Sequence, residues 1–255
     1  MNSNNHRQLL PQQAEILSAT SIALYWRESI DVRLNQTLIA CTHMLRQHFA
    51  GKITDIICSY SSLLIELSPP YTASTALLDD ICSAVDKFIS SYSQQAHYQG
   101  QHHVIDVYYG TDSGWDLALV SEQTGISVSE VIKRHSQPTY HVFANGFMPG
   151  FAYLGIVDKT LQLPRKATPR LQIPQGAVAI ADQQTAVYPY ASPGGWLILG
   201  QTAHSLMNKR ASDPQSWQPR LLPGDSVRFR PIDKQQFASQ GGILMRENKG
   251  PESRR

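Results

Sequence analysis

Residues 140–202 alternate short apolar runs with glycine and proline, and three of their segments read YHVFANGFMPGFAYLG at 140–155, IPQGAVAIA at 173–181 and YPYASPGGWLILGQT at 188–202. Apolar runs of four or five residues, bounded by such turn-forming residues, are typical of short β-strands. These runs fall at 140–143, 177–181, 196–199 and, further along, 226–229. The pattern predicts a compact β-rich C-terminal domain, and the shortness of its strands favours a barrel.

The first hundred residues change their hydrophobic period several times. Apolar residues recur at helical spacing from Leu34 to Phe49 and again from Leu77 to Ile89. Short strand-like runs surround these helices at 21–26, 53–59, 63–67 and 104–108. The resulting order, β-α-β-β-α-β, is that of a ferredoxin-like split unit with an antiparallel sheet. We therefore predict an α+β protein with an N-terminal ferredoxin-like α/β domain at 1–100, a barrel domain at 101–245 and a disordered tail at 246–255.

Composition excludes several functional classes. The 22 basic and 20 acidic residues leave a net charge of +2, whereas nucleic-acid binding needs clustered Lys and Arg. No run is long and apolar enough to span a bilayer, and the first residues, MNSNNHRQLLPQQ, lack the apolar core of a secretory signal. Cys41, Cys58 and Cys82 match no zinc-binding spacing. We expect reduced core cysteines in a cytoplasmic protein without a metal site, a membrane span or a nucleic-acid partner.

The segment from 141 to 202 is the candidate for function. It contains seven of the sixteen glycines and six of the fifteen prolines. It also contains four cationic side chains but only two carboxylates. Loops of defined shape on a rigid scaffold commonly bind ligands, and this charge balance favours an anionic small molecule. Arg165 and Arg170, in PRKATPR, are suited to bidentate carboxylate recognition. The alternative interpretation is that both are solvated surface charges, because a spacing of five places them on opposite faces of a straight strand.

A second candidate feature is the SPGGW segment at 192–196. Adjacent Gly194 and Gly195 free the backbone to present N–H groups, and Trp196 supplies a flat apolar wall. The segment fits an oxyanion or carboxylate site, and it equally fits a turn before a strand. The sequence contains no phosphate-binding loop, nucleophile elbow, zinc-protease motif or biotin-attachment lysine. Because few candidates for a general base accompany the anion-binding features, we expect a partner chain to supply the missing groups.

Four motifs follow one another in an order that resembles a known family. They are GFMPGFAYLG at 146–155, LPRKATPR at 163–170, IPQGAVAIA at 173–181 and YPYASPGGWLILGQT at 188–202. Together they are similar to the family of KipI and the B-type component of 5-oxoprolinase, also called allophanate hydrolase subunit 1. The resemblance extends over most of the chain from Gly51 onward, with Asp106 at a position where the family usually has proline. It implies an N-terminal α/β domain followed by a C-terminal cyclophilin-like β-barrel.

The resemblance also implies a function and partners. Bacterial members work with two other components of 5-oxoprolinase, the A and C subunits, in a hetero-oligomer that hydrolyses 5-oxoproline to glutamate with ATP and Mg. Related modules act in the carboxyltransferase part of urea carboxylase, and another member inhibits a histidine kinase, so both remain alternatives. We expect an enzyme subunit that is inactive alone, with no covalent cofactor on this chain, and we assign no catalytic residue. The candidate substrate- or partner-binding residues are Gly150, Phe151, Tyr153, Arg165, Arg170, Tyr188, Ser192, Gly194, Gly195, Trp196 and Thr202.

Overall fold

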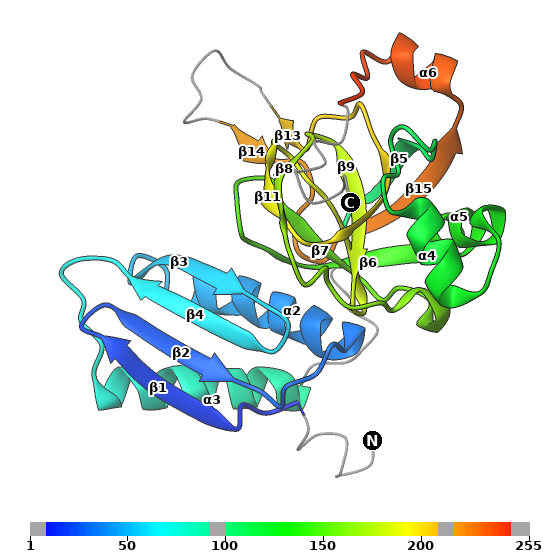
Figure 1. The fold of residues 1–255 in the computed structure, drawn as a ribbon. Coiled ribbons are helices and arrows are strands. Elements are labelled where there is room, and N and C mark those ends of the chain that lie inside the picture. Colours follow the sequence, from blue (N-terminus) through cyan, green and yellow to red (C-terminus); the bar gives the residue numbers. More distant parts are fainter. Residues whose placement is uncertain (1–8, 92–99, 209–216, 246–255) are drawn as a thin grey trace. The chain divides into compact units, whose positions relative to one another are not determined.

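A computed structural model describes residues 9–91, 100–208 and 217–245 (Figure 1). The chain divides into two compact units, Met1–Gly100 and Gln101–Arg255. The expected tail, residues 246–255, lies outside the described residues. No helix in the part of the chain that the structure describes has the length and apolar character needed to cross a membrane.

The first unit packs two helices against a four-stranded antiparallel sheet (Figure 1). The strand order in the sheet is β1-β2-β4-β3. Along β4, Leu63, Ile65 and Leu67 alternate inward, which gives the sheet one apolar face. The elements are β1 (Gln13–Ser18), β2 (Ser21–Tyr25), α2 (Val32–His48), β3 (Ile53–Cys58), β4 (Ser62–Leu67) and α3 (Thr75–Ser91).

The periodic apolar residues of the two helices form the core of this unit, as the sequence predicts. Asp31 begins α2 by accepting a hydrogen bond from the Leu34 N–H at 3.0 Å. Leu38 and Leu45 of α2 are completely buried, and the apolar face of α3 closes the same core. The cysteines are free thiols, and burial raises the pKa of Cys41 to about 12.

The predicted order of a ferredoxin-like split unit is not confirmed. The sheet of the first unit contains β1, which the sequence analysis missed, and the run at 104–108 lies in the second unit as part of β5 (His102–Tyr108). There β5 pairs in parallel with β15 (Ser226–Ile232) over seven residues, and Ile105 and Val107 are completely buried in the barrel core. The observed order in the first unit is β-β-α-β-β-α.

The second unit is built on a closed barrel with the strand order β10-β7-β6-β15-β5-β12-β9 (Figure 1). Two two-stranded ribbons, β8 with β11 and β13 with β14, accompany it. The remaining barrel strands are β6 (Thr139–Asn145), β7 (Ala152–Gly155), β9 (Ala177–Ala181), β10 (Gln184–Val187) and β12 (Leu197–Gln201). The other elements are α4 (Leu117–Thr124), α5 (Val128–Ser136), η1 (Lys159–Leu161), β8 (Arg170–Ile173), β11 (Ser192–Gly194), β13 (Met207–Asn208), β14 (Gln218–Pro219) and α6 (Lys234–Ser239).

A buried histidine joins helix α5 to the barrel. His135 is completely buried and stacks on Phe229 at a centroid distance of 4.8 Å. Its Nδ1 lies 2.8 Å from the Tyr109 hydroxyl, and its Nε2 lies 2.9 Å from the Thr185 hydroxyl. Because the Thr185 hydroxyl donates to the Ala179 carbonyl at 3.0 Å, it accepts from the ring, which assigns the proton to Nε2. Every polar atom of the imidazole is therefore paired while the ring is neutral.

Candidate functional site

A cavity of about 510 Å³ opens within the second unit, between the segment 165–169, the loop before β7 and the β11–β12 connection. Seven of the sequence-predicted residues line it: Phe151, Tyr153, Arg165, Tyr188, Gly194, Gly195 and Trp196. Four further lining residues were not among the candidates: Phe147, Lys166, Pro169 and Pro193. The structure thus brings most of the predicted set into one cavity, from four separate stretches of the chain.

Aromatic rings form the walls of this cavity. Phe151 lies at their centre, with edge-on contacts to Tyr153 at 4.9 Å, Tyr188 at 5.4 Å and Trp196 at 5.8 Å between ring centroids. Phe147 stands over Phe151 at 5.4 Å and remains 63% exposed, so it forms the rim. Edge-to-face contacts of this kind fix the orientation of each ring. The result is a rigid apolar surface suited to a small flat ligand.

Arg165 supplies positive charge at the mouth of the cavity. Its side chain is exposed, and no carboxylate in the described part of the chain forms an ion pair with it. Burial raises the pKa of Tyr188 to about 12, and the Arg165 charge acts against that rise. The pKa of Tyr153 is likewise raised by burial and lowered in part by Arg165. Arg165 therefore lies close enough to influence both tyrosine hydroxyls, and its guanidinium is available to an anion.

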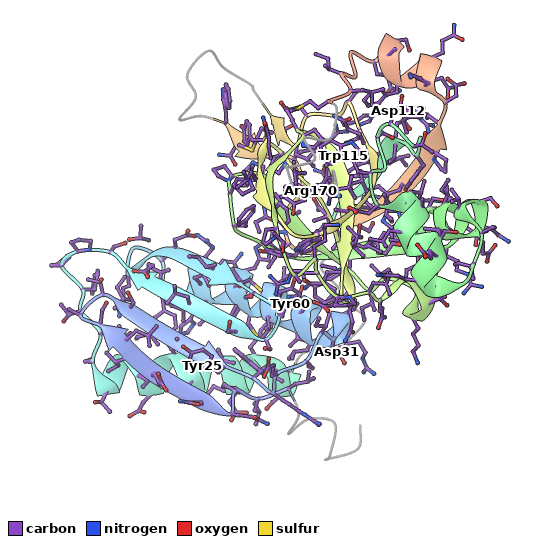
Figure 2. The ribbon with its side chains drawn as sticks, viewed as in Figure 1. Tyr25, Asp31, Tyr60, Asp112, Trp115 and Arg170 are labelled. Carbon is purple, nitrogen blue, oxygen red and sulfur yellow. The ribbon has the colours of Figure 1, made fainter. Side chains whose placement is uncertain are left out.

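Arg170, the other predicted anion-binding arginine, does not line the cavity. Its guanidinium makes a two-pronged ion pair with Asp116, both N–O distances being 2.8 Å, and it lies 5.5 Å from the ring centre of Trp115 (Figure 2). Lys166 Nζ lies 3.2 Å from the same carboxylate. The chain bends at residues 167–168, between the two arginines, and Arg165 lines the cavity while Arg170 is largely buried against Asp116.

The two glycines behave differently. A Cβ atom on Gly194 would lie 2.5 Å from the Tyr188 hydroxyl oxygen and 2.6 Å from Ile173 Cδ1, so a side chain there would force these two buried side chains to move. At Gly195 the nearest atom to such a Cβ is the Lys166 carbonyl oxygen at 3.4 Å, which is an ordinary contact. Gly194 therefore allows the backbone to approach Tyr188, and the Gly195 carbonyl accepts the Lys166 N–H at 2.8 Å, which joins the two sides of the cavity.

The remaining candidates have structural surroundings. Gly150 adopts a φ of 83°, and a Cβ there would lie 2.6 Å from Met207 Sδ. Thr202 is buried, and its N–H donates to the Gly176 carbonyl at 2.8 Å. Ser192 pairs with Ile173 in the β8–β11 ribbon. None of the three is among the residues that line the cavity.

The residues that the sequence analysis missed carry weak signals. Phe147 lies in the quoted GFMPGF segment and adopts a φ of 63°, which is uncommon for phenylalanine and raises its ring to the rim. Lys166 follows Arg165 directly and contributes to the sequence pattern only as one of the local cations. Among the described residues, no group of three or more His, Cys, Asp or Glu side chains is arranged to hold a metal ion.

Comparison with known families agrees with this architecture. A family model described as "Carboxyltransferase domain, subdomain C and D" matches residues 12–217, which span both units. The chain belongs to this family. The match includes every residue that lines the cavity. The resemblance inferred from the four sequence motifs is thereby confirmed at the level of the family.

Two curated relatives of this carboxyltransferase-family chain are named as the B-type component of 5-oxoprolinase. The one from Bacillus subtilis is 31% identical over 233 residues, covering 88% of this chain and 95% of the relative. The one from Escherichia coli O157:H7 is 48% identical over 128 residues, so the alignment covers half of this chain and 56% of that relative. The stronger identity is therefore confined to about half of each protein.

A solved structure supports the fold over almost the whole chain. The urea amidolyase of K. lactis superposes with a TM-score of 0.70 and covers 94% of this chain, which corresponds to 16% of that much longer protein. The sequence identity is 16%, so this likeness concerns the fold alone.

Proposed function

We propose that the chain is a subunit of an ATP-dependent 5-oxoprolinase complex that hydrolyses 5-oxo-L-proline to L-glutamate. The observation that carries the proposal is the aromatic cavity of about 510 Å³ with Arg165 at its mouth, an arginine that no described carboxylate neutralises. Family membership and the names of the relatives restrict the choice among the small anions that such a cavity would accept. The volume is in the range of small-molecule sites.

The cavity offers a matching group for each part of 5-oxoproline. Its carboxylate would pair with the guanidinium of Arg165, which presents two parallel N–H donors. Its small five-membered lactam ring would lie against Phe151 and Trp196. Its amide carbonyl develops negative charge during hydrolysis, and backbone N–H groups near Gly194 and Gly195 are the proposed donors to that oxygen. A lining of cationic and aromatic side chains therefore suits the carboxylate and the ring of this substrate.

The lining also supports the proposal that this chain does not react alone. Its eleven residues are aromatic, cationic, glycine or proline, and none of these described residues is a carboxylate or an imidazole. Tyr188, with a pKa raised to about 12, remains protonated at neutral pH and acts as a donor rather than a base. We place the base and the ATP and Mg site on the partner chains, the A and C subunits of 5-oxoprolinase, and expect the isolated chain to be inactive.

Three finer assignments belong to the same proposal. We propose that the closed barrel is of the cyclophilin-like type and that the functional domains correspond to residues 1–100 and 101–245. We also propose that the complex works in the cytoplasm. The closed barrel topology supports the first of these.

A second candidate function is carboxyl transfer to a small amide, with a separate biotin carrier. The observation that favours it is the description of the matching family, which names the carboxyltransferase domain. A bicarbonate-derived group and a urea-like acceptor would use the same cationic, aromatic cavity. The names of the relatives favour 5-oxoproline hydrolysis over this alternative.

Reconstitution distinguishes the two candidates. The chain is combined with its candidate partner subunits, and glutamate formation from 5-oxo-L-proline is measured with and without ATP, omitting each subunit in turn. We expect ATP-dependent glutamate only from the full set. Arg165→Gln should raise the KM for 5-oxo-L-proline by about tenfold or more, because one charge-assisted pair is lost. The matched control is Arg228→Gln, which removes an exposed arginine of β15 that does not line the cavity. Biotin-dependent carboxylation without glutamate formation would contradict the proposal.

A further inference from the structure

Asp116 is a buried carboxylate that contacts the cationic segment 165–170 and strand β12. Its side chain is 2% exposed, and it accepts hydrogen bonds from Arg170 Nη1 and Nη2 at 2.8 Å each. It also accepts one from Lys166 Nζ at 3.2 Å and one from the Ile198 N–H at 2.8 Å. All four donors come from segments far away in the sequence. A buried carboxylate with this many partners is rigidly fixed, because moving it would leave charged groups unpaired.

The position of Asp116 in the sequence suggests a different role from the one it has. It precedes α4 as the N-cap residue, and aspartate there usually accepts a hydrogen bond from the first turn. Here its side chain makes no capping hydrogen bond. The backbone of Asp116 instead donates to the Ile198 carbonyl at 2.9 Å while its side chain accepts from the Ile198 N–H, so the residue is attached to β12 at two points.

These contacts connect the two sides of the cavity. One side is the 165–169 segment: its Lys166 and the next residue, Arg170, both pair with the Asp116 carboxylate. The other side is the stretch from Gly194 to Trp196, which continues directly into β12 and Ile198. Asp116 therefore fixes the distance between the cationic side and the glycine side. Small displacements of such groups are known to reduce binding and catalysis strongly.

The same contacts decide which cation faces a ligand. The PRKATPR segment has three cations, and the buried carboxylate of Asp116 pairs with Arg170 and with Lys166, which lines the cavity. Arg165 is left with its guanidinium at the mouth. Without Asp116, the three cations, which lie within six residues, would lose this carboxylate and repel one another, and the segment would lose its defined course.

We propose that Asp116 is a positioning residue that sets the geometry of the anion-binding side of the cavity through its bonds to Lys166, Arg170 and Ile198. It acts through these residues and does not touch the ligand. The inference rests on the proposed function only for the identity of the ligand, because the contacts of Asp116 are a property of this chain.

The test uses Asp116→Asn, with Asp112→Asn as the matched control, since Asp112 is an exposed aspartate four residues earlier that pairs with Lys234. The probe is pyrrole-2-carboxylate, a flat five-membered ring with a carboxylate. Calorimetric titration of the whole chain, at a temperature well below its melting temperature, gives the Kd. In the reconstituted complex, KM and kcat for 5-oxo-L-proline are measured as well. We expect Asp116→Asn to raise both Kd and KM by about tenfold with a much smaller change in kcat, because a binding group is misplaced. Asp112→Asn should keep wild-type values.

A second variant protects the test against loss of folding. Arg170→Lys keeps the charge but removes the two-pronged pair, and it should raise Kd by a smaller factor although Arg170 does not line the cavity. A lower melting temperature with unchanged Kd and KM in both variants would overturn the inference, because a merely structural role predicts that result. If the wild-type complex forms no glutamate while probe binding still depends on Asp116, the proposed function is wrong and the positioning role of Asp116 remains supported.

Discussion

Acidification should destabilise the barrel unit through one buried imidazole. Burial lowers the pKa of His135 from 6.5 to about 3. The ring is neutral, and both of its nitrogens are already paired, with Tyr109 and with Thr185. Protonation would place a second donor proton on Nδ1, where the ring now accepts a hydrogen bond from the Tyr109 hydroxyl. The folded state therefore resists a proton that the unfolded chain accepts readily.

The sign and size follow from these pKa values. Because the pKa is lower in the folded state, the contribution to stability is complete above the unfolded pKa of 6.5. It is lost progressively as the pH falls towards 3, since the unfolded state binds the proton first. The slope approaches 1.4 kcal/mol per pH unit, so lowering the pH from 7 to 5 removes about 2 kcal/mol. Burial also lowers the pKa of His141, to about 4, which adds a loss in the same direction.

Urea denaturation followed by tryptophan fluorescence at pH 7, 6 and 5 measures this dependence. In His135→Gln the part of the slope that belongs to His135 should vanish, so the variant loses about 2 kcal/mol less than wild type between pH 7 and 5. His102→Gln, which removes an exposed imidazole from β5 of the same barrel, is the matched control. Equal pH slopes for wild type and His135→Gln would refute the reasoning, whatever the absolute stabilities.

Three further predictions concern the cavity and the end of the barrel. Gly194→Ala should destabilise the unit by about 1–3 kcal/mol, because the new methyl group would overlap the Tyr188 hydroxyl, whereas Gly195→Ala should have a much smaller effect; thermal denaturation compares them, and equal losses would contradict the contact argument. Tyr188→Phe removes the acceptor of a hydrogen bond from the Trp196 backbone and should cost about 1–3 kcal/mol in urea denaturation, and an unchanged midpoint would count against that bond. Asp106→Asn removes the charge of a buried carboxylate that pairs with the largely exposed guanidinium of Arg230, and it should lower the urea midpoint in the same assay; an unchanged midpoint would show that the pair does not stabilise the unit.

Local patterns in the sequence predicted the elements better than their partners. The helical spacing of Leu34 to Phe49 and the punctuated apolar runs after Pro138 correspond to α2 and to barrel strands. The run at 104–108 was recognised as a strand and then assigned to the sheet of the first unit. Its real partner, β15, begins more than a hundred residues later, and no local signal specifies a pairing over that distance. β1 was missed because four of its six residues are exposed and none is fully buried, so its alternation of apolar and polar residues is weak.

The difference between local and distant information also explains which residues of the candidate site could be predicted from the sequence. Clustering of glycine, proline and aromatic residues identified seven of the eleven residues that line the cavity. Arg165 and Arg170 looked equivalent, since both follow a proline in one short segment. What separates them is Asp116, 54 residues before Arg170, whose carboxylate is buried beneath the segment. A residue that acts only through tertiary contacts carries no motif of its own, so the sequence analysis did not single out Asp116.

The chemistry of the lining indicates how the reaction would be divided between this chain and the proposed partner chains. A base must accept a proton near neutral pH, yet the hydroxyl of Tyr188 is held protonated by burial. The guanidinium of Arg165 donates and never accepts. Such groups bind an anion and stabilise developing negative charge, and these are the two tasks that gain most from a rigid, partly dry wall. Proton transfer and ATP chemistry also need a carboxylate or an imidazole, and the described lining contains neither. Under the proposed function, a partner chain would contribute such a group at the open mouth beside Phe147 and Arg165.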